Sequence, residues 1–250
     1  MTKILLATAI TLIAAGLCAT AWAKAPNTAP WSYAGPSGPE NWGKLKSEYS
    51  LCKAGQEQSP IDIQNAFKYP FKPVSFNYRP NKVTVLNNGH TIQVSAPNSG
   101  SVSLPSGTFS LVQIHFHTPA EEKIQGRTYP LGVHLVHRND AGELAIIALM
   151  YEEGAHNTAL EPIFAAMPRN AGGRVTLNKA NIADLLPENH NAYAFMGSLT
   201  EPPCTEGVRW NVLTTAVQLS QAQLEAFRAI YPMNARPIQP LNDRSVVVGN

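Results

Sequence analysis

The chain has 250 residues, of which 44% are hydrophobic and 14% are charged, and its formal net charge is +2. This composition excludes a disordered chain, which would carry fewer apolar and more charged residues. The near balance of 19 Lys and Arg against 17 Asp and Glu excludes a strongly basic nucleic-acid-binding protein. The 20 prolines and 17 glycines follow no period, which excludes a collagen or a coiled coil and predicts many loops and few long helices.

Residues 1–23 have the pattern of a secretory signal peptide. Lys3 precedes an apolar run that ends in Ala-Trp-Ala at Ala23, a sequence that fits the small-x-small rule for a cleavage site. A membrane anchor is disfavoured because small residues end the run and no basic stop-transfer flank follows. A lipoprotein modified at Cys18 is disfavoured because the bulky Leu17 precedes that cysteine. We therefore expect cleavage after Ala23 and a secreted, most simply periplasmic, protein without further membrane contact.

Export changes how the cysteines are interpreted. Cys18 leaves with the signal peptide, so Cys52 and Cys204 remain. An oxidising compartment favours a disulfide between them, and the alternative is two separate buried thiols. A bridge over such a long loop would stabilise the fold by roughly 4–5 kcal/mol in the chain-entropy model.

Residues 24–250 contain no repeat or linker and are expected to form one domain. The segment 25–55 is poor in periodic apolar residues but rich in aromatic ones, so we expect an irregular arm that packs by its aromatic side chains. Short alternating runs then follow, separated by turn signals such as Asn-Asn-Gly, and they predict strands. The clearest are 83–86, 91–94, 109–114 and the continuous apolar run 144–151.

Helices are expected to be few. The capping box Thr158-x-x-Glu161 predicts one helix that ends before Pro168. The capping box Ser220-x-x-Gln223 predicts a second helix. Runs of strands with sparse helices are typical of a mainly β (α+β) fold, in which a large, mostly antiparallel sheet carries short peripheral helices.

Three of the histidines have the spacing of a metal site. His115 and His117 are two residues apart in a strand-like run, so their rings share one face. His134 lies in a second such run, which can return antiparallel beside the first. Three neutral imidazoles from two strands would give the open tetrahedral site of catalytic zinc, with the fourth position left for water. The spacing alone leaves open that these are hydrogen-bonded histidines on a solvated face, and His137 is expected to be structural.

Three segments carry a resemblance to a known family: Gln113–His117, Val133–His137 and Gly197–Cys204. With further motifs in the same order along nearly the whole mature chain, they resemble the α-class carbonic anhydrases in their bacterial exported form. The resemblance implies a large twisted sheet with the metal at the foot of a conical cleft. It implies zinc-dependent, reversible hydration of carbon dioxide to bicarbonate and a proton, so the partner is a small molecule and not a nucleic acid. Bacterial members are often dimers, which leaves a homodimer open.

The resemblance also implies roles for single residues. The three histidines match the zinc ligands. Thr200 matches the threonine that accepts a hydrogen bond from zinc-bound hydroxide, and Glu121 matches the carboxylate that accepts from that threonine. His90 matches the proton shuttle. The apolar wall of the carbon dioxide site is matched by Val136, Ile146, Leu199 and Trp210. The partner of the first ligand is matched by Gln113, and that of the second by Asn234. The bacterial disulfide is matched by Cys52 with Cys204.

Four positions depart from the family pattern. Phe195 stands where a tyrosine is often found and Ala235 where an aromatic residue is often found, and the other two bear on the metal site. Glu201 replaces a small or uncharged residue, and Gly132 replaces a glutamate that accepts a hydrogen bond from the third zinc ligand. From Gly132 we predict that His134 lacks this partner and that zinc leaves faster than in relatives. Gly132→Glu should then slow the loss, unless a carboxylate from elsewhere already fills the space.

Two other functions are open to this sequence. The first is a non-catalytic, carbonic-anhydrase-like binding module in the periplasm, against which the complete set of matched histidines argues. The second is a zinc store or chaperone, which would favour flexible His-rich tracts, and the sequence has none.

Overall fold

The computed structural model describes residues 31–249, so the predicted signal peptide and its cleavage site lie outside the described residues. The strands are β1 Asp62–Ile63, β2 Ala66–Tyr69, β3 Ser75–Tyr78, β4 Asn81–Asn87, β5 Ile92–Ser95, β6 Gly100–Leu104, β7 Gly107–His117, β8 Lys123–Ile124, β9 Leu131–Arg138, β10 Leu144–Glu153, β11 Arg174–Ala180, β12 Ala192–Ser198, β13 Glu206–Leu213, β14 Val217–Leu219 and β15 Val246–Gly249. The α-helices are α1 Trp42–Leu45, α2 Leu51–Ala54, α3 Glu161–Ala165 and α4 Gln221–Arg228. Short 3-10 helices lie at Gly35–Ser37, Pro39–Asn41, Ser47–Tyr49 and Ile182–Leu185. None of the helices in this range is long and apolar enough to cross a bilayer.

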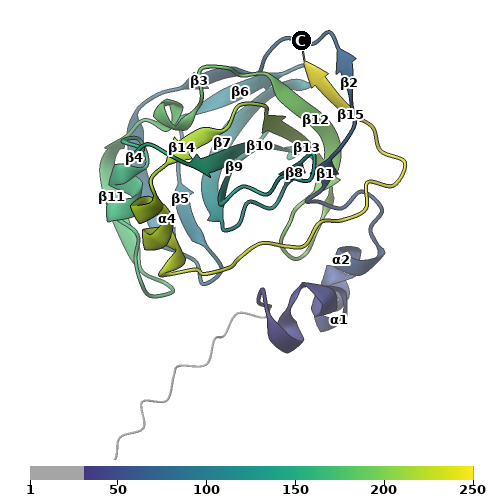
Figure 1. Ribbon diagram of the computed structural model, residues 1–250, viewed down its shortest axis with the longest axis horizontal. Coiled ribbons are helices and arrows are strands. Elements are labelled where there is room, and N and C mark those ends of the chain that lie inside the picture. The colour runs from purple at the N-terminus through teal and green to yellow at the C-terminus, as the bar shows by residue number, and fades with distance from the viewer. Residues whose placement is uncertain (1–30, 250) are drawn as a thin grey trace, which may run out of the picture.

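One large sheet crosses the molecule (Figure 1). Its strands run in the order β11-β4-β5-β7-β9-β10-β13-β12-β15-β2, with β6 also paired to β7, β3 paired to β6, and β14 paired to β10. Most neighbours are antiparallel, and the parallel pairs of this sheet are β10 with β13, β10 with β14, and β15 with β2. The predicted mainly β fold with a large, mostly antiparallel sheet and few short helices is confirmed.

The two faces of the sheet have different contents. In the central strands β7, β9 and β10, alternate side chains enter a large apolar core, which α3 and α4 cover. A register shift between Leu111 and Gln113 in β7 keeps Phe109, Leu111 and Ile114 in that same core. The shift leaves the next odd-numbered side chains of β7, including both histidines, on the opposite face.

Of the two helix N-caps predicted from the sequence, one is confirmed. Ser220 and Gln223 form the predicted reciprocal capping box at the start of α4. At α3 no side chain caps Leu160, the N-cap residue, so the predicted role of Thr158 is wrong. The side chain of Asn157 instead accepts hydrogen bonds from the backbone N–H groups of Ala159 and Leu160, both at 3.0 Å. An Asx turn one residue earlier thus satisfies two backbone donors at the start of the helix, in place of the predicted bond between Thr158 and the N–H of Glu161.

The N-terminal arm packs through aromatic side chains, as the sequence predicts. Trp31, Trp42 and Tyr49 form a separate buried cluster with the two cysteines. In Figure 1 its helices α1 and α2 lie beside the sheet, apart from the central strands. Trp31 and the adjoining Tyr33 contact residues near the functional site described below.

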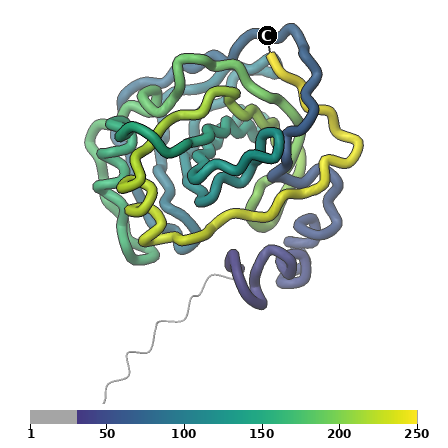
Figure 2. Tube along the Cα trace, viewed as in Figure 1, coloured from purple at the N-terminus to yellow at the C-terminus, as the bar shows by residue number. Residues whose placement is uncertain are grey.

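The segment that follows α4 joins the arm to the sheet. Figure 2 shows it, in yellow, passing between the sheet and the N-terminal helices. Here the buried Arg236 guanidinium donates to the carbonyl oxygens of Cys52 at 2.9 Å and Ser59 at 2.7 Å, and to the side chain of Gln58 at 2.9 Å. This one side chain therefore ties the C-terminal segment to two parts of the N-terminal region.

Cys52 and Cys204 form a disulfide with a sequence separation of 152 residues. Replacing both by serine is expected to lower the melting temperature, because closing so long a loop restricts the unfolded chain by roughly 5 kcal/mol in the chain-entropy model. For a domain of this size that corresponds to a decrease on the order of 10 °C. Thermal unfolding followed by circular dichroism, with and without reductant, measures the change. An unchanged melting temperature would show that the bridge contributes nothing to stability.

Candidate metal centre

Three histidines converge on the face of the sheet opposite the large core. His115 in β7 and His134 in β9 are direct partners across the ladder, and His117 is the partner of Gly132. Each ring offers one nitrogen such that these atoms all lie within 4.8 Å of one another. Among residues 31–249, no other set of three His, Cys, Asp or Glu side chains meets in this way.

Each ring is held by a hydrogen bond at its other nitrogen. The partners are oxygens of an amide, a backbone carbonyl and a carboxylate, all of which accept, so the nitrogen bound to them carries the hydrogen. The three pairs are His115 Nδ1 with Gln113 Oε1 at 3.0 Å, His117 Nδ1 with the Asn234 carbonyl at 2.7 Å, and His134 Nε2 with Glu122 Oε2 at 3.1 Å. The bare nitrogens are then the Nε2 atoms of the first two rings and the Nδ1 atom of the third.

The rings are neutral near pH 7. Burial lowers the pKa of all three below the ordinary value, and mutual repulsion of the imidazoles contributes for His115 and His134. Two of the bare nitrogens, His117 Nε2 and His134 Nδ1, are buried and have no hydrogen-bond partner. Buried polar atoms without a partner are uncommon, and neutral imidazole nitrogens are ligands of transition metals. The cluster therefore fits a metal ion with three nitrogen ligands.

Two consecutive glutamates, Glu121 and Glu122, follow β7 and are buried. Oε1 of Glu121 accepts from the backbone N–H of Arg236 at 2.7 Å, while Oε2 lies 3.4 Å from His117 Nε2. Burial and the charge of Glu122 raise the pKa of Glu121 well above its ordinary value, and the hydroxyl of Thr200 acts in the opposite direction. Glu121 thus lies beside the bare nitrogens, together with the buried side chain of Thr200.

Sequence reasoning missed Glu122. Gly132 led to the expectation that His134 lacks a partner, and this expectation is wrong, because Glu122 bonds its Nε2 atom. The signal was the second glutamate of the Ala-Glu-Glu sequence, but nothing in the pattern says that the chain after β7 turns back over β9.

A small cavity of about 170 Å³ opens beside the histidines. Of the predicted apolar wall, Val136, Ile146 and Leu199 line it. Trp210 is not among its lining residues and is almost fully buried. The Trp210 ring packs edge-on against the ring of His134 with 5.0 Å between centroids, so it supports the site from behind. The remaining lining residues are Gln113, His115, Thr200, Glu201 and Pro202.

The N-terminal arm reaches the same region. The Tyr33 hydroxyl donates to Glu201 Oε1 at 3.0 Å. The ring of His90 stacks on Trp31 with 3.6 Å between centroids and 4° between planes. Burial in this position lowers the pKa of His90 to about 4. The side chain of Asn234, whose backbone carbonyl accepts from His117, also donates to the carbonyl of His90 at 3.2 Å, so this turn is joined to the three-histidine cluster.

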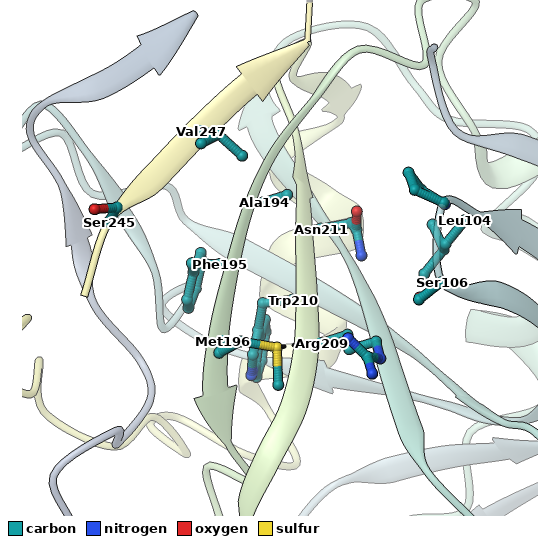
Figure 3. Close-up of a pocket in the computed structure, with 11 residues that line it drawn as sticks. Leu104, Ser106, Ala194, Phe195, Met196, Arg209, Trp210, Asn211, Ser245 and Val247 are labelled. Atoms are coloured by element: carbon teal, nitrogen blue, oxygen red, sulfur yellow. Dashed lines mark hydrogen bonds between the residues drawn. The ribbon is translucent and has the colours of Figure 1, made fainter. Parts of the chain in front are cut away.

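Other candidates lie apart from this centre. A larger cavity of about 330 Å³ is bordered by β12, β13, β15 and the β6–β7 turn (Figure 3), and Arg209 is the only ionisable side chain that lines it. His137 is buried, and its Nε2 atom is 2.6 Å from the hydroxyl of Tyr78. The structure therefore gives His137 a partner away from the three-histidine cluster.

Comparison with known proteins gives consistent matches. Residues 37–250 match the family model described as eukaryotic-type carbonic anhydrase. A carbonic anhydrase of Neisseria gonorrhoeae is 44% identical over 224 residues, which are 88% of each chain. The α-carbonic anhydrase from Thermovibrio ammonificans, solved with the inhibitor sulfanilamide, has a TM-score of 0.85 and 42% identity over 87% of this chain and 98% of its own. Dioscorin, solved with ascorbate, has a TM-score of 0.83 and 31% identity over 88% and 98% of the two chains. The matched range, residues 37–250, includes the positions of the three histidines and both glutamates.

Proposed function

Since the chain belongs to the α-carbonic anhydrase family and catalyses the reversible hydration of carbon dioxide, we propose that His115, His117 and His134 hold a zinc ion as its cofactor. The observation that carries this proposal is the set of three bare, neutral ring nitrogens within 4.8 Å of one another. Three nitrogen ligands with a fourth position open are typical of catalytic zinc. When bound, zinc lowers the pKa of a water ligand from about 15.7 to about 7, an effect for which carbonic anhydrase is itself the established example.

The cavity beside the histidines supplies the substrate site in this proposal. Carbon dioxide is apolar, so it needs dispersion contacts more than hydrogen bonds. Val136, Ile146 and Leu199 provide an aliphatic wall for it, and the volume of about 170 Å³ suits a molecule of this size. These side chains would hold the substrate against the histidine cluster by van der Waals contact alone.

Thr200 and Glu121 would orient the attacking group. A hydroxyl has one hydrogen, so Thr200 must accept from the nucleophile if it donates to the carboxylate of Glu121. Arg236 supports this direction, because its backbone N–H holds the other oxygen of Glu121. The chain would thus fix the direction in which a lone pair of the nucleophile points.

Carbon dioxide hydration by the full mature protein tests the proposed function. We expect stopped-flow hydration that a zinc chelator abolishes and that added zinc restores, together with one zinc per chain. A binding module would give neither result. This comparison is informative because the related dioscorin was solved with ascorbate.

His90→Ala is expected to lower kcat on the order of tenfold while kcat/KM stays nearly constant, because export of the proton follows the chemical step. Stacked on Trp31, His90 has a pKa of about 4 and remains deprotonated at neutral pH. The relay therefore requires the ring to leave Trp31, where its pKa rises toward the ordinary value. Added imidazole should restore most of the loss in stopped-flow assays. An equal decrease of kcat and kcat/KM would exclude a shuttle.

We also propose export with cleavage after Ala23, which rests on the sequence of the N-terminal segment. The expected product in a Gram-negative host is a periplasmic protein whose first residue is Lys24. N-terminal sequencing of the periplasmic fraction measures this. A cytoplasmic protein that keeps its first residues would contradict it.

A further inference from the structure

The carboxylate of Glu122 lies on the outer side of the third histidine. Its Oε2 atom is 3.1 Å from His134 Nε2, and both side chains are completely buried. Building on the zinc site proposed above, we propose that Glu122 is the positioning residue that holds His134 in the tautomer and orientation in which Nδ1 faces the metal. The interaction comes from a loop residue that directly follows Glu121, and not from the strand that carries His134.

Strand β9 offers no acceptor of its own at this place. The residue two positions before His134, on the same face, is Gly132. A Cβ atom added at Gly132 would lie 3.0 Å from both Cα and Cβ of Ala120. The loop that carries Glu122 therefore packs directly on the strand at the point where the strand has no side chain. The absence of a side chain at Gly132 therefore leaves room for the loop that brings Glu122 to His134.

The loop is held in place independently of the histidine. The backbone N–H of Ala120 donates to the carbonyl of Tyr129 at 2.9 Å, and the Thr118 hydroxyl donates to the carbonyl of Pro130 at 3.0 Å. Both bonds join the loop to the segment that leads into β9. These two bonds hold the backbone from which Glu122 reaches His134.

The two adjacent glutamates serve opposite sides of the same ring. Oε2 of Glu121 lies 3.9 Å from Nδ1 of His134, on the side of the bare nitrogens. Glu122 bonds the other nitrogen, and its second oxygen, Oε1, has no hydrogen-bond partner. Burying a carboxylate with so few hydrogen-bond partners lowers the stability of the fold. Its presence here therefore argues that it serves to hold the ring of His134. A carboxylate only accepts, so it selects the tautomer with hydrogen on Nε2.

The first test is zinc retention. Glu122→Ala is expected to lower zinc affinity about 10- to 100-fold, the usual effect of removing such a partner. A competing chelator measures both affinity and the rate of zinc loss. Glu122→Gln keeps the volume, but its amide can also donate to Nε2 and favour the wrong tautomer, so zinc loss should accelerate here as well. Should Glu122→Ala fail to fold, Glu122→Gln carries the same test.

The matched control is Glu201→Gln, which removes a carboxylate from the cavity beside the histidines, where its hydrogen-bond partner is Tyr33 and not His134. Its zinc loss should change much less than that of Glu122→Gln. If both variants lost zinc equally fast, Glu122 would act only through its charge. If Glu122→Ala lost zinc within about twofold of the wild-type rate, Glu122 would have no role. Either result overturns the proposal.

The second test needs neither zinc nor activity. In the metal-free protein the ring nitrogen shifts of His134 should report hydrogen on Nε2 and none on Nδ1, and Glu122→Ala should produce a mixture of tautomers. Unchanged shifts in the variant would contradict the proposal. If the wild type shows these shifts but does not bind zinc, the proposed cofactor is wrong while the positioning by Glu122 stands.

The same geometry reverses the expectation for Gly132→Glu. The new side chain would start 3.0 Å from Ala120 and would compete with a carboxylate that is already bonded to His134. Zinc loss from this variant should be as fast as, or faster than, in the wild type. A slower loss with an intact fold would mean that Glu122 leaves the ring partly unsatisfied.

Discussion

His117→Ala is expected to reduce the zinc content from one ion per chain to nearly none and to lower carbon dioxide hydration by more than about a thousandfold. The size follows from the several kcal/mol that a metal contributes to a transition state, since each 1.36 kcal/mol is a factor of about ten in rate. His117 is the proposed ligand whose Nδ1 atom donates to the backbone carbonyl of Asn234, so its direction is fixed by the main chain. Elemental analysis and stopped-flow hydration measure the two effects.

His137→Ala is the matched control for this experiment. It removes a buried imidazole from the same strand as the ligand His134, but His137 is bonded to Tyr78 and lies outside the cluster. The variant should lose stability, because it removes that bond and leaves a space, while it keeps one zinc per chain. Retention of full zinc by His117→Ala, or its loss in His137→Ala, would contradict the assignment of the ligands.

The sequence predicted the part of the site that follows from strand geometry. The two-residue period places His115 and His117 on one face, and an antiparallel return of the chain brings His134 to the same place. The structure pairs His115 directly with His134. The contacts among the three histidines follow from the alternation of side chains along a strand, and that alternation can be read from one sequence.

The sequence could not predict contacts that depend on the path of loops. Glu122 reaches His134 only because the chain after β7 turns back over Gly132. The stacking of His90 on Trp31 depends on where the N-terminal arm lies, and that arm has no periodic pattern. At α3, Asn157 accepts from the backbone N–H groups of Ala159 and Leu160, and the sequence pattern does not distinguish it from Thr158 as the residue that caps the first turn.

The same distinction applies to the apolar wall. Val136 and Ile146 are neighbours in the β9–β10 ladder and both reach the cavity. Trp210, the partner of Ile146 in β13, is covered and contacts the ring of His134 instead. The resemblance to the family placed all three at the carbon dioxide site, but which of them is exposed in the cavity depends on packing between side chains.

Thr200→Val is expected to lower kcat/KM for hydration about 10²- to 10³-fold, the usual effect of removing one hydrogen-bonding group aimed at a reacting atom. Valine keeps the shape and removes only the hydroxyl, and Thr200 is not one of the three histidine ligands, so one zinc per chain should remain. This separates orientation of the nucleophile from metal binding, which Glu121→Gln would not do, because Glu121 lies 3.4 Å from His117 Nε2.

Thr205→Val is the control for Thr200→Val, since Thr205 is exposed in the same loop and its backbone carbonyl, not its side chain, accepts from Leu199 at 3.0 Å. Its kcat/KM should stay within about twofold of wild type, as for most surface substitutions. The hydroxyl of Thr200 acts through Glu121, so the double variant Thr200→Val with Glu121→Gln should lose less than the product of the two single losses. If Thr200→Val retained wild-type kcat/KM with zinc bound, or if the losses were fully additive, Thr200 and Glu121 would not act as one unit on the nucleophile.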